Sequence, residues 1–194
     1  MESVAAFTDT YLPTVNGVTY TVQTWRDHWQ GRGGRMEVVY PDAPDRQPEA
    51  DEHPVRSLPL PIYAGYRLGL PRVPDAVTDV DVVHAHTPFS LGLAGVRLAR
   101  SQDIPLVATY HTPTSEYASY LSSWGPVRKR AATLSRRYES WILNRADAVI
   151  VPSEATGEYV TRKLDVENPQ VVPNGVDTER FQPVDSTAFR ERHD

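Results

Sequence analysis

The sequence has no cysteine, and its apolar runs are short. The absence of cysteine excludes disulfides, thiolate metal sites and catalysis by a thiol nucleophile. No apolar run approaches the ~20 residues that a membrane-spanning helix needs. No secretory leader is evident, because the chain passes from Met1 almost directly into a strand pattern. The simplest expectation is therefore a cytoplasmic chain.

Two glycine-rich signatures are also missing. The sequence contains neither G-x-G-x-x-G nor G-x-x-x-x-G-K-[ST], so it shows no dinucleotide fingerprint and no P-loop. Lysine is scarce, with Lys129 and Lys163 as the only two. The net charge of −5 argues against general nucleic-acid binding, and no nucleic-acid partner is expected. The remaining composition, 40% hydrophobic and 23% charged, is typical of a globular domain.

Short apolar runs that alternate with helical patterns predict an α/β fold. Strands are expected at residues 4–7, 36–40, 81–86, 104–110, 146–151 and 170–172. Helices are expected from Gly17, from a cap at Thr87-Pro88, from Gly125 and from a cap at Ser153. Residues 42–53 are expected to form a surface loop, and residues 55–60 a short edge strand. Several strands are apolar throughout, which is typical of a parallel sheet covered on both faces. We predict a three-layer, doubly wound, Rossmann-like sheet.

Polar residues follow several of these strands, at the edge of the sheet where ligands bind in such folds. They are the loop 9–17, His86 and Thr87, the stretch 111–117, and Ser153. His84 and His86 lie in one strand, and we expect them to point to opposite faces, with structural roles. Two histidines on opposite faces would be poor joint ligands, so no metal site is predicted.

The segment after the first strand is suited to an anion. Gly17 opens a helical pattern in which Val18, Val22, Trp25 and Trp29 share one face. Free N–H groups and the helix dipole favour negative charge at such a helix start, and glycine lets a bulky group approach the backbone. An Asn-Gly pair is also an ordinary turn, so the residues alone leave both interpretations open.

A strongly basic helix is expected at residues 125–145. Its one acid is Glu139, and its local charge is +5. Its six basic residues are Arg128, Lys129, Arg130, Arg136, Arg137 and Arg145. Its apolar residues are expected to form one core-facing side: Val127, Ala131, Leu134, Tyr138, Trp141 and Ile142. The basic side chains form either a solvated face or a docking surface for anionic lipid headgroups, at about 1 kcal/mol per residue near the surface.

Five blocks together resemble the N-terminal half of the retaining glycosyltransferases of family 4, which have the GT-B fold. They are residues 7–18 (FTDTYLPTVNGV), 83–92 (VHAHTPFSLG), 108–112 (ATYHT), 146–153 (ADAVIVPS) and 171–177 (VVPNGVD). The blocks occur in the family's order and span nearly the whole chain. Within the family, the chain looks most similar to diacylglycerol glucosyltransferases and phosphatidylinositol mannosyltransferases.

The resemblance implies two Rossmann-like domains that face a cleft. Residues 1–172 would form the acceptor-side domain, and residues 173–194 the linker and the start of a donor-binding C-terminal domain. A helix pattern that runs up to Asp194 agrees with more chain following. The second domain's paired glutamates and basic phosphate-binding residues are absent from this sequence. The chain alone is therefore expected to be inactive.

The resemblance also suggests roles near the chemistry. Asn16, Gly17 and Val18 match the glycine loop that lies against the donor diphosphate, where backbone N–H groups stabilise the leaving phosphate. His111 matches the histidine that contacts the transferred sugar, and we name it as the catalytic candidate.

Further candidates surround these residues. Acceptor contacts are expected from Asp9, Tyr11, Tyr117 and Tyr120, although Asp9 equally fits a local loop cap. Thr87, Ser153, Asn174 and Gly175 are expected to line the cleft, with Ser153 also serving as a helix N-cap. Membrane contacts are expected from Arg128, Lys129, Arg130, Arg136 and Arg137.

The function implied is transfer of a hexose from a nucleotide sugar, UDP-glucose or GDP-mannose, to a membrane lipid with retention. The enzyme would be cytoplasmic and peripherally bound to an anionic membrane surface, with no cofactor and no metal. Two alternatives stay open. One is a glycosyltransferase with a soluble sugar or sugar-phosphate acceptor, and the other is a non-catalytic binding module of the same fold.

Overall fold

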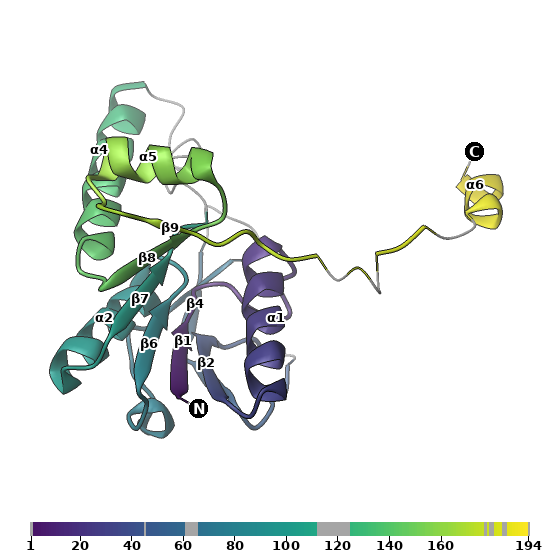
Figure 1. The fold of residues 1–194 in the computed structure, drawn as a ribbon, viewed down its shortest axis with the longest axis horizontal. Helices are drawn as coiled ribbons and strands as arrows, with labels where there is room; N and C mark the ends of the chain where they lie inside the picture. The colour runs from purple at the N-terminus through teal and green to yellow at the C-terminus, as the bar shows by residue number, and fades with distance from the viewer. Residues whose placement is uncertain are drawn as a thin grey trace.

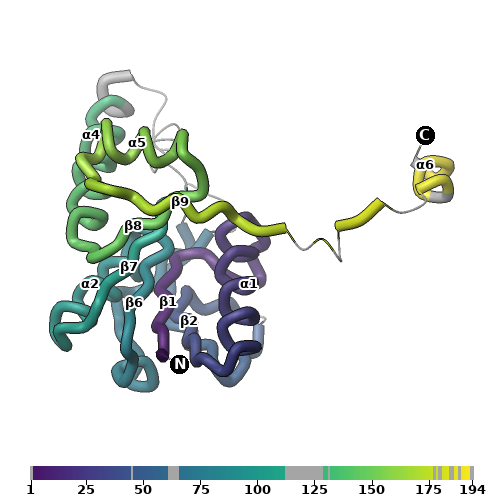
Figure 2. The backbone as a smooth tube through the Cα atoms, in the orientation of Figure 1, coloured from purple at the N-terminus to yellow at the C-terminus, as the bar shows by residue number. Residues whose placement is uncertain are grey.

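The core of the molecule is a seven-stranded parallel sheet (Figures 1 and 2). The computed structural model describes residues 2–44, 46–60, 66–111, 125–176, 178, 181–183 and 186–193. The strand order is β3-β2-β1-β6-β7-β8-β9, and each neighbouring pair is parallel. The strands are β1 (Ser3–Phe7), β2 (Arg35–Pro41), β3 (Glu52–Val55), β6 (Val82–Ala85), β7 (Leu106–Thr109), β8 (Ala148–Val151) and β9 (Gln170–Val171).

Helices cover both faces of this sheet and make three layers (Figure 1). The helix α1 (Gly17–Gly31) covers one face, where Val22 packs with Ala6 and Val38. The other face carries α2 (Ser90–Gln102), α4 (Gly125–Leu143) and α5 (Glu154–Leu164). Smaller elements are the antiparallel pair β4 (Ser57–Pro59) and β5 (Arg67–Gly69), the turn η1 (Asp75–Val77) and α6 (Thr187–His193). The predicted three-layer, doubly wound architecture is confirmed.

The period-two alternation of β1 sorts its side chains between the two layers. Ala5 and Phe7 pack with α2, whereas Ala6 packs with α1. At Gly95 of α2, an added Cβ would come within 3.0 Å of the Phe7 ring. Glycine therefore lets α2 lie close against β1, which fixes the position of the loops that leave both elements.

The segment 42–53 differs from its prediction as a surface loop. Its last two residues belong to β3, and Glu52 is only 4% exposed. Arg26 Nη1 lies 2.9 Å from one carboxylate oxygen of Glu52, and Arg46 Nη2 lies 2.8 Å from the same oxygen. A charged residue in a proline-bearing stretch looks solvated in sequence, but Arg26 of α1 and Arg46, six positions away, make its burial tolerable.

The side of α4 that faces the core differs from the predicted side. Glu139, Ile142 and Leu143 are buried, whereas Leu134 is 65% and Trp141 40% exposed. At about 100° per residue, Leu134 and Trp141 lie about 140–160° from Glu139, on the opposite side of the helix. The expected apolar face was therefore wrong for these two residues, because the apolar residues of α4 span more of its circumference than the sheet covers.

Candidate functional site

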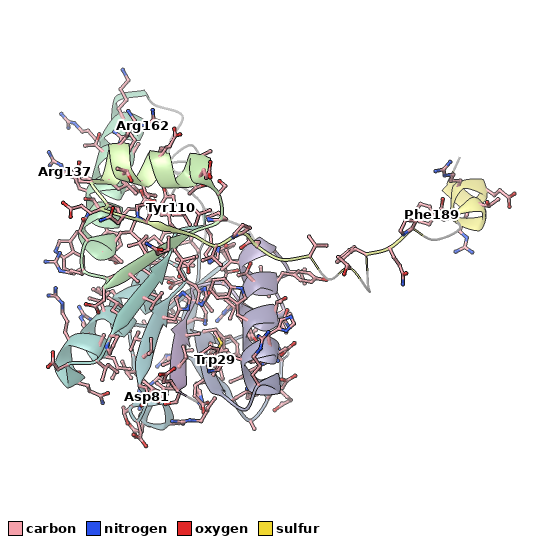
Figure 3. All side chains as sticks on the ribbon, viewed as in Figure 1. Trp29, Asp81, Tyr110, Arg137, Arg162 and Phe189 are labelled. Carbon is pink, nitrogen blue, oxygen red and sulfur yellow. The ribbon has the colours of Figure 1, made fainter. Side chains whose placement is uncertain are left out.

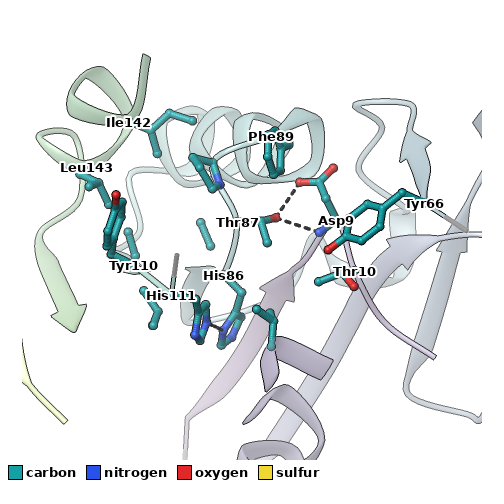
Figure 4. A pocket seen from close by; sticks show the side chains of 15 residues that line it. Asp9, Thr10, Tyr66, His86, Thr87, Phe89, Tyr110, His111, Ile142 and Leu143 are labelled. Carbon is teal, nitrogen blue, oxygen red and sulfur yellow. Dashed lines mark hydrogen bonds between the residues drawn. The ribbon is translucent and has the colours of Figure 1, made fainter. Parts of the chain in front are cut away.

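A pocket lies where the strand order of the sheet changes direction (Figure 4). The chain leaves β1 toward β2 on one side, and leaves β6 toward β7 on the other, so the loops diverge at the carboxyl ends. The pocket is lined by Asp9 and Thr10 after β1, by His86 and Thr87 after β6, and by His111 after β7. It encloses about 40 Å³, and a cavity of that size holds only about three water molecules. A larger ligand must therefore extend out from the pocket.

Asp9 ties three segments of this site together. Its carboxylate accepts hydrogen bonds from Thr87 Oγ1 at 2.7 Å, Ser90 Oγ at 2.9 Å and the Leu91 N–H at 3.1 Å. Thr87 Oγ1 also lies 2.8 Å from the Asp9 N–H and accepts from it. Burial raises the pKa of Asp9, although the hydrogen bonds from Thr87, Leu91 and Ser90 oppose that shift.

These hydrogen bonds define the structural roles of Asp9 and Thr87. Asp9 accepts from the first turn of α2, 81 and 82 positions away in the chain, so it connects two segments rather than capping its own loop. Contact between Asp9 and an acceptor stays a prediction. The helix α2 starts at Ser90, with Phe89 in the N-cap position and no side-chain cap there. The expected cap at Thr87-Pro88 is wrong, because the Thr87 hydroxyl is directed to Asp9 instead.

Three histidines form a stack at the same edge, in which His84 and His86 are buried and His111 is half-buried. The rings of His84 and His86 lie 4.0 Å apart at 29°, and those of His86 and His111 lie 5.6 Å apart at 17°. Trp25 of α1 packs against the first two, at 5.4 and 5.5 Å. The expectation that His84 and His86 point to opposite faces is wrong, because residues two apart in a strand share a face.

Hydrogen bonds connect this stack to the strand ends. His84 Nε2 lies 2.7 Å from Thr109 Oγ1, and His86 Nδ1 lies 3.3 Å from His111 Nε2. Burial lowers the pKa of His84 to about 3 and that of His111 to about 4. Burial also holds the pKa of His86 well below its usual range. All three rings are therefore neutral at pH 7 and act as hydrogen-bonding groups rather than as cations.

Across the described ranges, no three His, Cys, Asp or Glu side chains are grouped so that they could hold a metal ion. The two ring nitrogens that meet between His86 and His111 face each other instead of a shared point.

The start of α1 has the features of an anion site. Asn16 is the N-cap and accepts from the Thr19 N–H at 3.0 Å, while its amide donates to Thr10 Oγ1 at 2.7 Å. The N–H groups of Gly17 and Val18 stand in the first turn, where no intrahelical acceptor exists. No acidic residue lies in that turn, and a Cβ built on Gly17 would meet no atom within 4 Å. Nothing described in the protein requires glycine there, and the space in front of it is open.

The predicted tyrosine contacts fall in two groups. Tyr11 is only 3% exposed and packs against Tyr40, with ring centroids 4.9 Å apart. Burial raises its pKa, and Arg46 stacks 5.6 Å from its ring. The structure thus places Tyr11 in the core beside the Arg26–Glu52 pair, and an acceptor contact from Tyr11 stays a prediction. Tyr117 and Tyr120 lie outside the described residues.

The other cleft candidates lie at the same edge of the sheet but apart from the pocket lining. Ser153 is confirmed as the N-cap of α5 and accepts from the Thr156 N–H at 3.2 Å. It is exposed, as are Asn174 and Gly175 beyond β9. A cleft role for these three residues stays a prediction. Trp25 was missed from sequence because its partner strand could not be deduced. Tyr66 and Phe89 also line the pocket.

The outward side of α4 combines basic and apolar residues. Lys129, Arg130 and Arg137 are exposed, and Figure 3 shows Arg137 extending away from the body of the protein. Leu134 and Trp141 lie on the same outward side, and the Arg145 guanidinium stacks 3.9 Å from the Trp141 ring. Arg136 is only half-exposed, and the side chain of Arg128 lies outside the described set. None of the helices described is long and apolar enough to cross a membrane.

The fold and the pocket define a Rossmann-like domain with its ligand site at the switch point of the sheet. The chain belongs to Glycosyltransferase Family 4, whose model matches residues 15–180. Its Rossmann-like sheet matches the fold of GT-B glycosyltransferases.

Curated relatives and solved structures agree with this family. The chain is 28% identical over 188 residues to the alpha-monoglucosyldiacylglycerol synthase of Streptococcus pneumoniae, covering 92% of the chain and 42% of that protein. It is 35% identical over 168 residues to a GDP-mannose-dependent alpha-mannosyltransferase of Mycolicibacterium smegmatis, covering 80% and 43%. The sucrose-phosphate synthase of Thermosynechococcus elongatus has a similar fold, with TM-score 0.67, 15% identity, and coverage of 99% and 53%. The chain thus spans less than half the length of these two curated relatives.

Proposed function

We propose that the chain is the acceptor-side part of a retaining hexosyltransferase that glycosylates a membrane lipid. The observation that carries the lipid acceptor is the outward side of α4, where Leu134 and Trp141 lie among basic side chains. Helices that lie in a membrane interface combine arginine and lysine with tryptophan and leucine in this way. The relative from Streptococcus pneumoniae is named for a diacylglycerol product, which supports the same acceptor class.

The donor is proposed to be UDP-glucose or GDP-mannose, bound with its diphosphate at the start of α1. Three features support this: the N–H groups of Gly17 and Val18 have no acceptor among the described residues, that turn holds no acid, and the space at Gly17 is open. The same two N–H groups would stabilise the negative charge that develops on the leaving phosphate. One relative is named as GDP-mannose-dependent, which leaves the base and the sugar to be decided by experiment.

His111 is proposed to contact the transferred sugar. It lines the pocket two strands away from Gly17, and its neutral ring hydrogen-bonds without bringing a positive charge. A second, donor-binding domain is proposed to close over this edge and to supply the remaining substrate contacts. The chain by itself is expected to show no turnover, and the whole protein is expected to act at the cytoplasmic membrane surface.

The acceptor is tested with the full-length protein. It is incubated with UDP-glucose or GDP-mannose and total lipid extract, and the organic phase is analysed by mass spectrometry. A lipid heavier by one hexose, absent with Gly17→Trp, supports the proposal. Donor consumption with an unchanged lipid pool would instead indicate a soluble acceptor, and no consumption of any nucleotide sugar would favour a non-catalytic module.

The membrane contact is tested separately with the 194-residue chain. We expect it to bind vesicles that contain phosphatidylglycerol and not vesicles of phosphatidylcholine alone. Substitutions that remove the positive charges of Arg130 and Arg137 together should weaken vesicle binding about 30-fold, since each basic residue contributes about 1 kcal/mol. The matched control is the same pair of changes at Arg97 and Arg100, two exposed arginines of α2. Equal losses for both pairs would indicate a diffuse charge effect and argue against docking by α4.

A further inference from the structure

The contact between His86 and His111 allows only one proton between two ring nitrogens. His86 Nδ1 and His111 Nε2 lie 3.3 Å apart, and the two rings are nearly parallel at 17° with centroids 5.6 Å apart. One nitrogen must donate and the other accept. The two possible arrangements differ in which nitrogens carry the protons in each neutral ring.

The surroundings of the second nitrogen of His86 distinguish the two arrangements. His86 Nε2 is buried and has no hydrogen-bond partner among the residues that the structure describes. The rings of His84 and Trp25 pack against the same imidazole, at 4.0 and 5.5 Å. A proton on Nε2 would be a buried N–H without an acceptor, which proteins avoid more strictly than an unpaired acceptor. The proton of His86 is therefore on Nδ1.

It follows that His86 donates and His111 accepts. Because His111 Nε2 then carries no proton, the proton of the neutral His111 ring must be on Nδ1. His111 Nδ1 makes no hydrogen bond to the described residues, and it is not among their buried unpaired atoms. Since His111 lines the pocket, this N–H is available there as a donor.

We propose that His86 is a positioning residue that holds His111 in the Nδ1–H tautomer and presents that N–H to an oxygen atom in the pocket. The oxygen would be a hydroxyl of the transferred hexose, so this inference rests on the proposed function. Without His86, the His111 ring is free to exchange tautomers and to rotate. His84 supports the pair from behind, because its bond to Thr109 Oγ1 and its stacking fix the ring of His86. The low pKa values of all three rings agree with neutral tautomers at pH 7.

The tautomer is read directly by ¹⁵N nuclear magnetic resonance of the ring nitrogens in the 194-residue chain. The signals of His111 are assigned by their loss in His111→Asn. In the wild type we expect the Nδ1–H form of His111 to dominate by at least about fivefold. His86→Phe keeps an aromatic ring but removes the donor, and should bring the two tautomers to comparable populations. His86→Asn, whose amide can still donate near the Nδ1 position, should restore the bias.

His84→Phe is the matched control. It keeps the stacked ring and loses the Thr109 bond, but leaves the His86–His111 contact in place, so the His111 tautomer should stay biased. A wild-type His111 in the Nε2–H form would overturn the proposal, as would an unchanged tautomer in a folded His86→Phe. The resonance readout does not depend on activity. If the full-length protein forms no hexosylated lipid while the tautomers behave as expected, the proposed function fails and the positioning role of His86 stands.

Discussion

The three stacked histidines predict that lowering the pH from 7 to 5 weakens the folded state. The pKa is about 3 for His84 and about 4 for His111 in the folded protein, against about 6.5 in an unfolded chain. Because the folded values are depressed, the stabilisation is complete above pH 6.5 and is lost as the pH falls toward the folded values. Compared with pH 7, keeping the His84 or the His111 ring neutral at pH 5 lowers the free energy of unfolding by about 2 kcal/mol for each ring. The two rings together cost about 4 kcal/mol, a large part of a typical domain's stability, and the pKa of His86 shifts in the same direction.

The contribution of one ring can be isolated with His84→Asn. Urea unfolding, followed by tryptophan fluorescence, is measured at pH 7 and at pH 5 for the wild type and the variant. The variant should be less stable at pH 7, since it loses the ring stack and changes the Thr109 bond. Its further loss between pH 7 and pH 5 should be smaller than that of the wild type by about 2 kcal/mol.

The control is Trp25→Phe, which disturbs the same stack without removing a titrating group. It should lower stability at both pH values and leave the pH response unchanged. If His84→Asn loses as much stability between pH 7 and pH 5 as the wild type does, His84 is not held neutral by burial. The assignment of neutral rings to the whole stack would then have to be abandoned.

Three further predictions concern the carboxylates and the glycine. Asp9→Ala should lower the free energy of unfolding by about 1–3 kcal/mol, because Thr87, Ser90 and Leu91 lose an acceptor, whereas the exposed Asp79→Ala should change it by less than about 0.5 kcal/mol. Glu52→Gln should lower the free energy of unfolding by about 3–5 kcal/mol in the same urea assay, since two arginines lose their buried partner. The control Glu158→Gln, in an exposed ion pair, should lower it by less than about 1 kcal/mol. Equal effects of the two changes would contradict the burial argument. Gly17→Ala should change the free energy of unfolding by no more than about 1 kcal/mol, because the space at Gly17 is open. Gly17→Trp should fold yet abolish lipid glycosylation by the full-length protein. An active Gly17→Trp enzyme would show that the nucleotide sugar does not bind at this helix start.

The order of strands and helices was readable from the sequence because its signals are local. Apolar runs placed the main strands, and Ser153 marked the start of α5 through a bond to a residue three positions away. The end of the loop 42–53 was not readable. Glu52 is buried only because Arg26 and Arg46 reach it, and Arg26 comes from a helix 26 residues earlier. The exposed side of α4 likewise depends on where the sheet ends, which no pattern within the helix records.

The candidate site was predictable as a place more than as a set of contacts. The rule that ligands bind beyond the carboxyl ends of parallel strands brought Asp9, His86 and His111 to one edge, and the pocket lies there. The spacing of His84 and His86 already implied a shared face, so their stacking was available to a correct use of the strand period. The burial of Tyr11 was not available, because it depends on Tyr40 and Arg46 from other segments.

The hydrogen bonds of Asp9 also bear on the order of events when the chain folds. They join residues 78 to 82 positions apart, and the strands that bring them together pair in parallel. Contacts between such distant residues form slowly, since a long stretch of chain must be ordered before they are gained. The pocket is therefore expected among the last features to form. The Leu91 amide should exchange its hydrogen for deuterium only when the β1–β6 pairing opens, so that it reports the integrity of the site as a whole.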